Sequence, residues 1–343
     1  MDFRLEEVPE PAPGPGEVKV AVRACGVCGS DLHEYTMGPL QIPRPESPHP
    51  RTGVALPVTL GHEMSGVVAE LGAGVEGFAV GDRVAMEPVT SCGRCRPCRR
   101  GDYNLCDSVA FMGLSALGGG YADFQVSPAN LVHKLPDSVP FDVGALVEPL
   151  SVGWYGLQRA GFAIGQTALV TGAGPVGSGV VSCLRTAGAG WVGATDLAPA
   201  RLALATALGA DDAFDPRSTD VVAAIAERTD GEGVDLAIDA TGAQAGIDTA
   251  LACVRRGGTV LSLGVFEEPS TIDLTTMLGK GTRLVQSPAY AWTFPEVIAA
   301  LARGDLATDG MITARVPLAD AVDGAFEELV RNRDAHVKIV IEP

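Results

Sequence analysis

The fold of the middle of the chain is decided by eleven residues, Thr167-Ala-Leu-Val-Thr-Gly172-Ala-Gly174-Pro175-Val176-Gly177. The first five form a continuous apolar run, which is typical of a strand buried on both faces. An apolar helix is expected from Pro175 and Val176 to about Ala187. Gly172 suits a tight turn, Gly174 allows close approach of the backbone to a pyrophosphate, and Gly177 allows the helix to pack on the strand. The stretch therefore predicts a strand–turn–helix unit that binds a dinucleotide at its helix N-terminus.

A carboxylate follows the next predicted strand, Trp191–Thr195. Asp196 lies nineteen residues past Gly177, where an acidic side chain can bind a ribose 2′-hydroxyl. The same charge would repel a 2′-phosphate, so the sequence favours NAD over NADP. Two alternatives stay open: Asp196 caps a helix, or the nearby Arg201, on the ribose edge, accommodates a 2′-phosphate.

Further apolar strands and helices alternate after this unit. Strands are expected at residues 234–239, 259–263 and 283–286, and helices at 201–208 and 221–227. This alternation predicts an α/β fold with a doubly wound parallel sheet. The two ends of the chain differ, with half-buried strands at residues 17–24 and 337–341. We expect a β-rich first part (1–151), an α/β domain (152–286) and a return to the β-rich domain (287–343).

The composition excludes several classes of partner. The chain has 343 residues, 46% of them hydrophobic, and a formal net charge of −17. Nucleic acids and anionic membranes need basic surfaces, so neither is expected as a partner. No apolar run reaches the roughly 18 residues of a membrane span, and residues 1–7 lack the apolar core of a secretory signal. We expect a cytoplasmic protein, in which eight cysteines favour metal binding over disulfides.

Four cysteines form the most specific metal signal. Cys92, Cys95 and Cys98 are spaced by three residues, and Cys106 follows eight residues later. Four thiolates from one short lobe can enclose a tetrahedral zinc and leave no open position, which predicts a structural site. Disulfides fit a reducing compartment poorly, and iron–sulfur clusters usually have a different spacing.

A second candidate metal site is dispersed along the chain. Its ligands would be Cys28, His62, Glu63 and Glu148, and a catalytic zinc takes three protein ligands with one open position. Spacing does not prove that these residues converge, and His62 and Glu63 could instead be a structural pair. Near Cys28, which two glycines flank as in a tight turn, Ser30 and His33 could pass a proton outward. The alternative is a buried cysteine among small residues.

A long loop is expected over residues 37–57, which contain six prolines. Loops of this length in compact domains are often functional. We expect its His49 to be exposed to solvent.

These motifs together resemble the zinc-dependent medium-chain alcohol dehydrogenases over nearly the whole chain. The resemblance rests on Cys28-Gly-Ser-Asp-Leu-His33, Gly61-His62-Glu63, Gly81-Asp82-Arg83-Val84, the four-cysteine lobe, Glu148-Pro149-Leu150 and the 172–177 turn. Within the family the chain looks most like the polyol branch, especially the (R,R)-butanediol dehydrogenases. Residues 31–35, the proline loop with its His49-Pro50, and residues 56–62 and 145–150 support this branch. Sorbitol and threonine dehydrogenases share the zinc motifs.

The resemblance implies a fold, cofactors and roles. It implies a GroES-like catalytic domain with a Rossmann domain, two zinc ions per chain, NAD, and a small alcohol or diol substrate. Cys28 and His62 would bind the catalytic zinc, while Glu63 and Glu148 would each be a ligand or exchange with water. Ser30 would accept the substrate proton and His33 would relay it. The residues placed near the nicotinamide would be Gly264 and Val265.

Three expectations complete this interpretation. The protein should be a homo-oligomer, a dimer or a tetramer. Family members usually have an additional strand before the segment that corresponds to residues 3–9, so either the start lies upstream of Met1 or this edge strand is absent. The competing hypothesis is a non-enzymatic protein, in which the cysteine lobe is an interaction module and the α/β domain senses a nucleotide.

Overall fold

The computed structural model describes all residues, 1–343, and the chain divides into two compact units. The first unit comprises Met1–Glu148, Phe294–Ala302 and Ile312–Pro343, and the second comprises Pro149–Thr293 and Arg303–Met311. The α/β domain was expected over residues 152–286. It therefore begins three residues after, and ends seven residues before, the observed segment Pro149–Thr293. Residues 303–311 also belong to the second unit, because Ser182 Oγ and Thr186 Oγ1 donate to the carbonyls of Ala307 and Asp305 at 2.7 and 2.8 Å.

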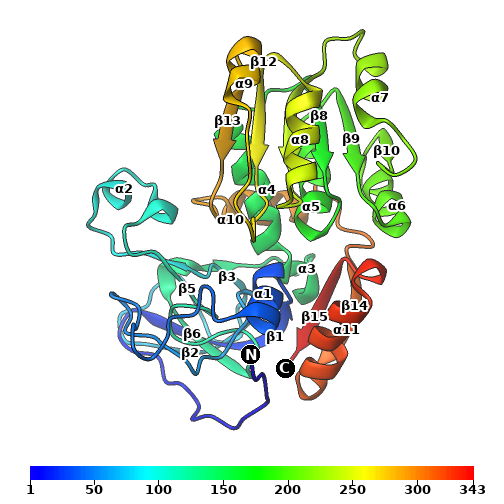
Figure 1. Ribbon diagram of the computed structural model, residues 1–343. Helices are drawn as coiled ribbons and strands as arrows, with labels where there is room; N and C mark the ends of the chain where they lie inside the picture. Colours follow the sequence, from blue (N-terminus) through cyan, green and yellow to red (C-terminus); the bar gives the residue numbers. More distant parts are fainter. The chain divides into compact units, whose positions relative to one another are not determined.

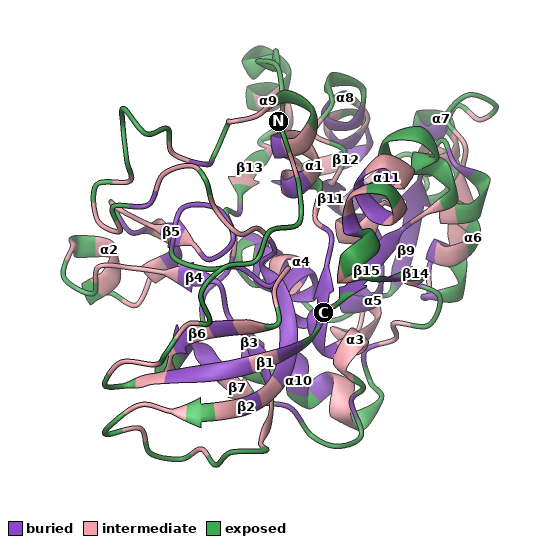
Figure 2. Cartoon of the chain, turned by 90° about the horizontal axis from the view of Figure 1, so that it is seen from below, coloured by how far each residue is buried: buried purple, intermediate pink, exposed green.

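Strand β1 (Glu17–Gly26) is the centre of the first unit. The sheet has the order β14-β15-β1-β2-β3-β7, and β6 also pairs with β1. The alternating valines of β1 are buried, as the colouring of that strand in Figure 2 shows. The other strands are β2 (Glu63–Leu71), β3 (Arg83–Met86), β6 (Phe124–Pro128), β7 (Val132–Lys134), β14 (Ile312–Pro317) and β15 (Lys338–Glu342).

The register of β1 brings distant segments to its last two residues. Gly26 pairs with Glu63 of β2 on one side and with Val340 of β15 on the other. A Cβ on Gly26 would lie 2.0 Å from Glu63 Oε2, so glycine is required there to make room for this carboxylate. The end of β1 is thus the point where β2 and β15 meet the segment that leads into Cys28.

Short elements complete the first unit. The ribbon formed by β4 (Val89–Thr90) and β5 (Ala110–Phe111) closes the base of the four-cysteine lobe, residues 92–106. The helices are α1 (Gly29–Met37), α2 (Arg96–Arg99), α3 (Phe141–Ala145), α10 (Phe294–Arg303) and α11 (Glu328–Arg331). A π-helical turn spans Ala321–Glu327, and 3₁₀ turns span 103–105, 129–131, 318–320 and 333–335.

The second unit is a six-stranded parallel sheet in the order β10-β9-β8-β11-β12-β13 (Figure 1). Its strands are β8 (Thr167–Thr171), β9 (Trp191–Thr195), β10 (Asp212–Phe214), β11 (Val234–Asp239), β12 (Val254–Ser262) and β13 (Arg283–Gln286). Its helices are α4 (Val147–Ala160, which begins at the end of the first unit), α5 (Pro175–Thr186), α6 (Pro199–Ala207), α7 (Val221–Arg228), α8 (Gln244–Cys253) and α9 (Leu274–Lys280). The strand order reverses between β8 and β11, which is where ligands bind in such sheets.

The fold class predicted from the sequence is confirmed, with a β-rich unit and a doubly wound parallel sheet. Strands β8, β9, β11 and β13 have the predicted bounds. None of the helices combines the length and the apolar character that a membrane crossing requires.

Candidate active site

The four-cysteine lobe brings its thiols together without a disulfide. The sulfur atoms of Cys92, Cys95, Cys98 and Cys106 all lie within 4.8 Å of one another, and every cysteine of the chain is free. Zinc–sulfur bonds of about 2.3 Å in a tetrahedron place sulfurs roughly 3.8 Å apart. The 4.0 Å between the sulfurs of Cys92 and Cys98 suits this geometry. The lobe therefore fits a four-coordinate zinc.

The backbone of the lobe favours thiolates. The N–H groups of Cys95 and Cys92 donate to the sulfurs of Cys92 and Cys106, both at 3.3 Å. Backbone N–H groups of Arg94 and Cys95 lower the pKa of the Cys92 thiol to about 6, whereas burial raises the pKa of Cys98 to about 11. Four neighbouring thiols cannot all ionise without a cation among them, because their negative charges repel one another. A bound metal ion would offset this repulsion.

Cys28, His62 and Glu63 form a second group of metal-ligating side chains, called here the ligand cluster. Their ligand atoms lie within 4.8 Å of one another. Glu63 is fully buried, yet its Oε2 has no hydrogen-bond partner. A buried carboxylate oxygen without a donor is costly unless a cation or proton satisfies it. A thiolate, an imidazole and a carboxylate also match the ligand types of catalytic zinc, so the cluster fits this metal.

Asp31 orients two members of the ligand cluster. It is fully buried, and its Oδ2 accepts a hydrogen bond from the backbone N–H of Cys28 at 3.1 Å. Its Oδ1 lies 3.4 Å from His62 Nδ1. Both atoms are buried, and neither makes a hydrogen bond to another group. A carboxylate beside Nδ1 favours the proton on that nitrogen and leaves Nε2 to a metal, an arrangement common in zinc sites. Although burial opposes it, the nearby His62 lowers the pKa of Asp31.

Lys338 is a buried cation beside the ligand cluster, and sequence analysis missed it. Its Nζ donates to Glu63 Oε1 at 2.6 Å and to the carbonyl of Val27 at 2.9 Å. Burial favours the neutral amine, but Glu63, Cys28 and Glu148 outweigh burial and raise the pKa of Lys338. The only signal in the sequence is a single lysine at the start of the apolar strand 338–341, and 275 residues separate it from Glu63.

Glu148 stands apart from the other expected ligands. It is buried in the first turn of α4 and is not a member of the compact ligand cluster. Its charge contributes to the raised pKa of Lys338, after the larger contributions of Glu63 and Cys28.

Ser30 and His33 lie on helix α1, whereas the sequence suggested a glycine-rich bend. Cys28 is the N-cap residue of this helix, and Asp31 at its third position accepts from the N–H of Cys28, as in a capping box. Gly26 and Gly29, expected to form a tight turn, both have ordinary negative φ angles. Ser30 Oγ lies 3.3 Å from His62 Nε2, and His33 follows one turn later.

The proline loop is tied to the cysteine lobe. His49, expected to be exposed, is half-buried, and its Nε2 lies 3.1 Å from the carbonyl of Val109. Arg51 donates to the carbonyls of Ser108 and Thr90, both at 2.9 Å. The N–H of Ser108 in turn donates to the sulfur of Cys106 at 3.4 Å. The loop thus depends on the segment that follows the lobe's last cysteine.

The glycine turn in the second unit has the geometry expected of a dinucleotide site. Gly172 has a φ of +88°, which favours glycine, and a Cβ on Gly177 would lie 1.7 Å from the carbonyl of Gly172. Gly174 is the N-cap of α5 and has open space where a Cβ would be. Pro175 is the first residue of α5 and has no N–H, so the free backbone donors at the helix start come from the residues that follow it, Val176 and Gly177.

Asp196 reaches this glycine turn directly. Its Oδ2 accepts from the N–H of Ala173 and its Oδ1 from the N–H of Ala198, both at 2.8 Å. Ala198, the N-cap residue of α6, has no side-chain capping bond of its own, so Asp196 serves the start of this helix as well as the glycine turn. Arg201 Nη1 lies 3.9 Å from Asp196 Oδ1.

Gly264 and Val265 follow β12 at the same edge of the sheet. A Cβ on Gly264 would lie 2.2 Å from the N of Gly242, which follows β11. The N–H of Gly264 donates to the carbonyl of Asp239 at 3.1 Å, and Val265 is exposed. Two loops therefore meet at the carboxyl ends of β11 and β12, beside the point where the strand order reverses.

Comparisons with known families cover most of the chain. Residues 14–137 match the model described as "Alcohol dehydrogenase GroES-like domain", and residues 175–303 match "Zinc-binding dehydrogenase". The chain belongs to the zinc-dependent medium-chain alcohol dehydrogenases. The resemblance seen in the sequence is confirmed.

Individual relatives of this dehydrogenase are polyol enzymes. It is 37% identical over 342 residues to an (R,R)-butanediol dehydrogenase of Bacillus subtilis, covering 100% of this chain and 97% of that protein. It is 34% identical over 346 residues to a sorbitol dehydrogenase of the same organism, covering 100% and 94%. The crystal structure of 2R,3R-butanediol dehydrogenase from Bacillus subtilis matches with a TM-score of 0.93 and 38% identity, covering 100% and 96%.

Solved neighbours of this dehydrogenase carry nicotinamide cofactors of both kinds. A zinc-binding dehydrogenase from Sinorhizobium meliloti was solved bound to NADP (TM-score 0.87, 32% identity, covering 97% and 94%). A dehydrogenase from Escherichia coli was solved with NADH (TM-score 0.86, 30% identity, covering 97% and 94%). Zinc and a nicotinamide dinucleotide are therefore the cofactors of this family, and both sets of residues described above fit them.

Proposed function

We propose that this dehydrogenase interconverts a vicinal diol and its hydroxyketone with NAD, with (R,R)-2,3-butanediol and acetoin as the pair. The observation that carries the proposal is the ligand cluster. Cys28, His62 and a buried Glu63 oxygen without a donor converge within 4.8 Å, in a family whose butanediol and sorbitol members are similar to this chain. Such a donor set suits a zinc site that keeps a position for substrate.

The residues of this chain have distinct roles in the proposal. Cys28 and His62 would hold the metal, and Glu63 or Glu148 would complete or exchange at its coordination. Zinc, when bound, would lower the pKa of the substrate hydroxyl, and NAD would accept the hydride. Ser30 takes the hydroxyl proton at Oγ, since this oxygen lies 3.3 Å from His62 Nε2. His33, one turn further along α1, relays that proton outward.

The second hydroxyl of a vicinal diol explains the choice of substrate. Glu63 and Glu148 add two carboxylates to the region around Lys338. One of them can bind the metal while the other accepts a hydrogen bond from the second hydroxyl. The sorbitol dehydrogenase relatives make sorbitol or another polyol the second candidate, because a polyol offers the same pair of neighbouring hydroxyls. L-Threonine, with its hydroxyl beside an amine, is a third.

Cofactor choice follows from Asp196. Its two oxygens accept hydrogen bonds from the N–H groups of Ala173 and Ala198, which hold its charge at the glycine turn, and a carboxylate at this position of a dinucleotide site would repel a 2′-phosphate. Gly172, Gly174, Pro175, Val176 and Gly177 would bind the pyrophosphate, and Gly264 and Val265 would lie near the nicotinamide. Arg201, close to Asp196, would lie on the ribose edge.

A substrate screen with one variant tests the function. Wild-type protein is assayed with NAD and NADP against the 2,3-butanediol isomers, sorbitol and threonine, and we expect the highest kcat/KM for (R,R)-2,3-butanediol with NAD. Cys28→Ala should lose turnover at least about a hundredfold while binding NAD normally, because it removes a metal ligand. Cys25→Ala, three residues away, is the matched control and should keep activity. Full activity of Cys28→Ala would refute the catalytic zinc. A wild-type protein that is inactive with every substrate and both cofactors would instead favour the non-enzymatic alternative.

The expected homo-oligomer and cytoplasmic location stay predictions of the sequence. Light scattering coupled to size-exclusion chromatography checks the first, and cell fractionation checks the second.

A further inference from the structure

Tyr121 lies beside the ligand cluster, in a segment without a metal-binding or catalytic motif. Its hydroxyl donates to Asp31 Oδ2 at 2.7 Å and lies 3.1 Å from the carbonyl of Gly26. Its backbone N–H donates to the carbonyl of Leu60 at 2.9 Å, two residues before His62. Tyr121 therefore contacts the segments that carry Cys28, Asp31 and His62 at once.

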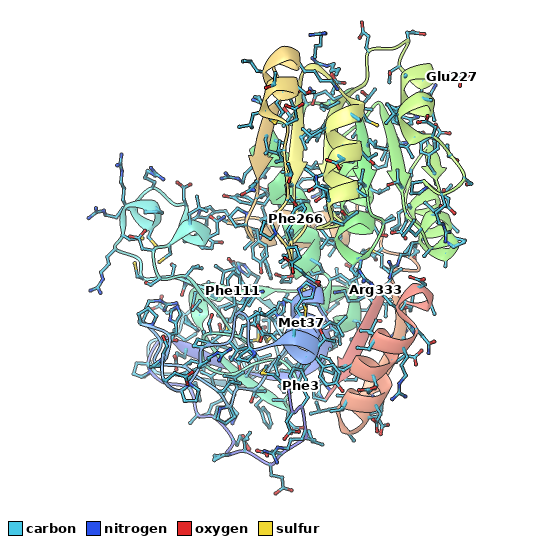
Figure 3. All side chains as sticks on the ribbon, in the orientation of Figure 1. Phe3, Met37, Phe111, Glu227, Phe266 and Arg333 are labelled. Carbon is cyan, nitrogen blue, oxygen red and sulfur yellow. The ribbon has the colours of Figure 1, made fainter.

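The ring of Tyr121 is held in a defined place. Gly61 has a φ of +95°, and a Cβ there would lie 2.8 Å from Tyr121 Cδ1, so the backbone passes close beneath the ring. The ring also meets the ring of Phe326 edge-on, with ring centroids 5.8 Å apart. Phe326 also packs against Phe3 at 5.1 Å, and Figure 3 labels Phe3 below helix α1. The contacts with Gly61 and Phe326 thus hold the ring in the position from which its hydroxyl reaches Asp31.

The hydrogen bonds of Asp31 explain what this hydroxyl does. Oδ2 accepts from the N–H of Cys28 and from Tyr121, while Oδ1 faces His62 Nδ1 at 3.4 Å. With two donors fixed on one oxygen, the plane of the carboxylate is set and the other oxygen stays directed at the imidazole. Without the phenol, Asp31 would keep one donor and could rotate away from His62.

We propose that Tyr121 is a positioning residue of the catalytic zinc site, whose hydroxyl fixes Asp31 so that His62 presents Nε2 to the metal. This inference rests on the proposed function, because it requires the ligand cluster to bind zinc. Hydrogen-bond partners of metal ligands typically change metal affinity about 10–100-fold. Tyr121 acts one residue further from the metal, through Asp31, so we expect an effect near tenfold.

The experiment compares Tyr121→Phe with wild type. Phenylalanine keeps the ring and its packing and removes only the hydroxyl. Metal-free protein is titrated with cobalt(II) and zinc in competition with a chelator, and the mixed-ligand cobalt absorption reports the ligand cluster separately from the all-sulfur lobe. We expect about tenfold weaker binding at the ligand cluster, an altered cobalt spectrum there, and unchanged binding at the lobe.

Tyr35→Phe is the matched control. Tyr35 belongs to the same aromatic group, with its ring centroid 4.9 Å from Phe3, but its hydroxyl donates to Glu327. Removing that hydroxyl should leave metal affinity unchanged. If both variants lost metal affinity equally, Tyr121 would act by general packing, and the proposal would be overturned.

A double-mutant cycle with Asp31→Asn tests the route of the effect. If Tyr121 acts through Asp31, Tyr121→Phe should change metal affinity by less than about twofold in the Asp31→Asn background. A full additional tenfold loss there, or wild-type affinity of Tyr121→Phe alone, overturns the inference. A wild-type protein that binds one zinc, in the lobe only, instead overturns the proposed function.

Discussion

At the scale of the residue, Lys338 is the buried positive charge that pairs with Glu63 of the ligand cluster. Its ammonium and the Glu63 carboxylate are each 1% exposed, and 2.6 Å separates Nζ from Oε1. A buried pair of this kind gains little over an apolar pair, but removing one partner leaves the other charge uncompensated. In this chain the charge left without a partner would be that of Glu63, which we assign to the metal.

Replacing Lys338 by methionine should therefore destabilise metal-free protein by about 3 kcal/mol. Urea unfolding in the presence of a chelator measures the change. Added zinc should reduce the difference in unfolding free energy between Lys338→Met and wild type, because the metal offers Glu63 a new cation. Lys134→Met is the control: its ion pair with Asp82 is far more accessible to solvent than the Lys338–Glu63 pair, so its loss should change stability much less. Equal stability of Lys338→Met and wild type would contradict the role of the pair.

Asp196 permits a second test at the scale of a residue. Asp196→Ala removes both the charge and two hydrogen bonds of the turn, whereas Asp196→Asn keeps one acceptor oxygen and removes only the charge. We expect both variants to raise the KM for NAD about tenfold, as for loss of a charged hydrogen bond, and to change the KM for NADP less. Steady-state kinetics with both cofactors measure this. An unchanged ratio of the two KM values would remove Asp196 from cofactor choice.

At the scale of elements, Asp235 joins three neighbouring strands of the parallel sheet. It lies on β11, accepts from the N–H of Thr167 on β8 at 2.8 Å and from Nε of Arg255 on β12 at 2.7 Å. Burial raises the pKa of its carboxyl, but the hydrogen bonds from Thr167 and Arg255 outweigh burial, and the net pKa is lowered. The ionised form is therefore favoured in the folded protein.

Asp235→Asn should lower stability at pH 7 by about 1–3 kcal/mol. Because the folded pKa is lowered, the stabilisation is complete above the unfolded value of about 3.9 and disappears as the pH falls through the folded pKa. The difference between variant and wild type should thus shrink below about pH 4. Thermal or urea unfolding between pH 3 and 7 measures it, and a difference that stays constant with pH would contradict this account.

The sequence predicts those elements and sites whose defining residues lie within a few positions of one another. Strands β8, β9 and β11 are short apolar runs, and the lobe's cysteines and the glycine turn lie within a few residues of one another. Helix α1 was missed because Gly29–Met37 has little amphipathic character and depends on its Asp31 cap and on tertiary packing. The start of β12 was missed because Arg255, Arg256 and two glycines interrupt its apolar run.

The ligand cluster could be suspected but not assembled from the sequence. Its convergence depends on the pairing of Gly26 with Glu63 and of the same residue with Val340, which no local pattern specifies. Lys338 and Tyr121 come from segments far from the motifs, so their roles appear only when the sheet forms.

At the scale of the whole molecule, the structure predicts two zinc ions of different character. The lobe offers four thiolates, whereas the ligand cluster offers three protein ligands, the number with which a catalytic zinc keeps one position for water or substrate. Mass spectrometry of dialysed protein should find two zinc ions per chain. A mild chelator should remove one zinc together with activity and leave the other in place.

Two variants assign these ions. Cys95→Ser should release the lobe's zinc and lower the melting temperature, while Cys253→Ser, a buried cysteine far from either group in the sequence, should keep both ions. Loss of the lobe's zinc should also loosen the proline loop through Ser108 and Arg51, and hydrogen exchange of residues 38–57 would record it. One zinc per wild-type chain would contradict the two-site description.

The placement of β15 beside β1 also dictates an order of events during synthesis. Cys28, His62 and Glu63 leave the ribosome early, but their sheet partner and the ammonium that neutralises Glu63 lie on residues 338–342. At translation rates of about 5–20 residues per second, some 15–55 seconds separate the two events. The contiguous stretch 149–293 can fold meanwhile. The pairing of β1 with β15 and the neutralisation of Glu63 can therefore occur only after residues 338–342 have been synthesised, long after the residues of the ligand cluster.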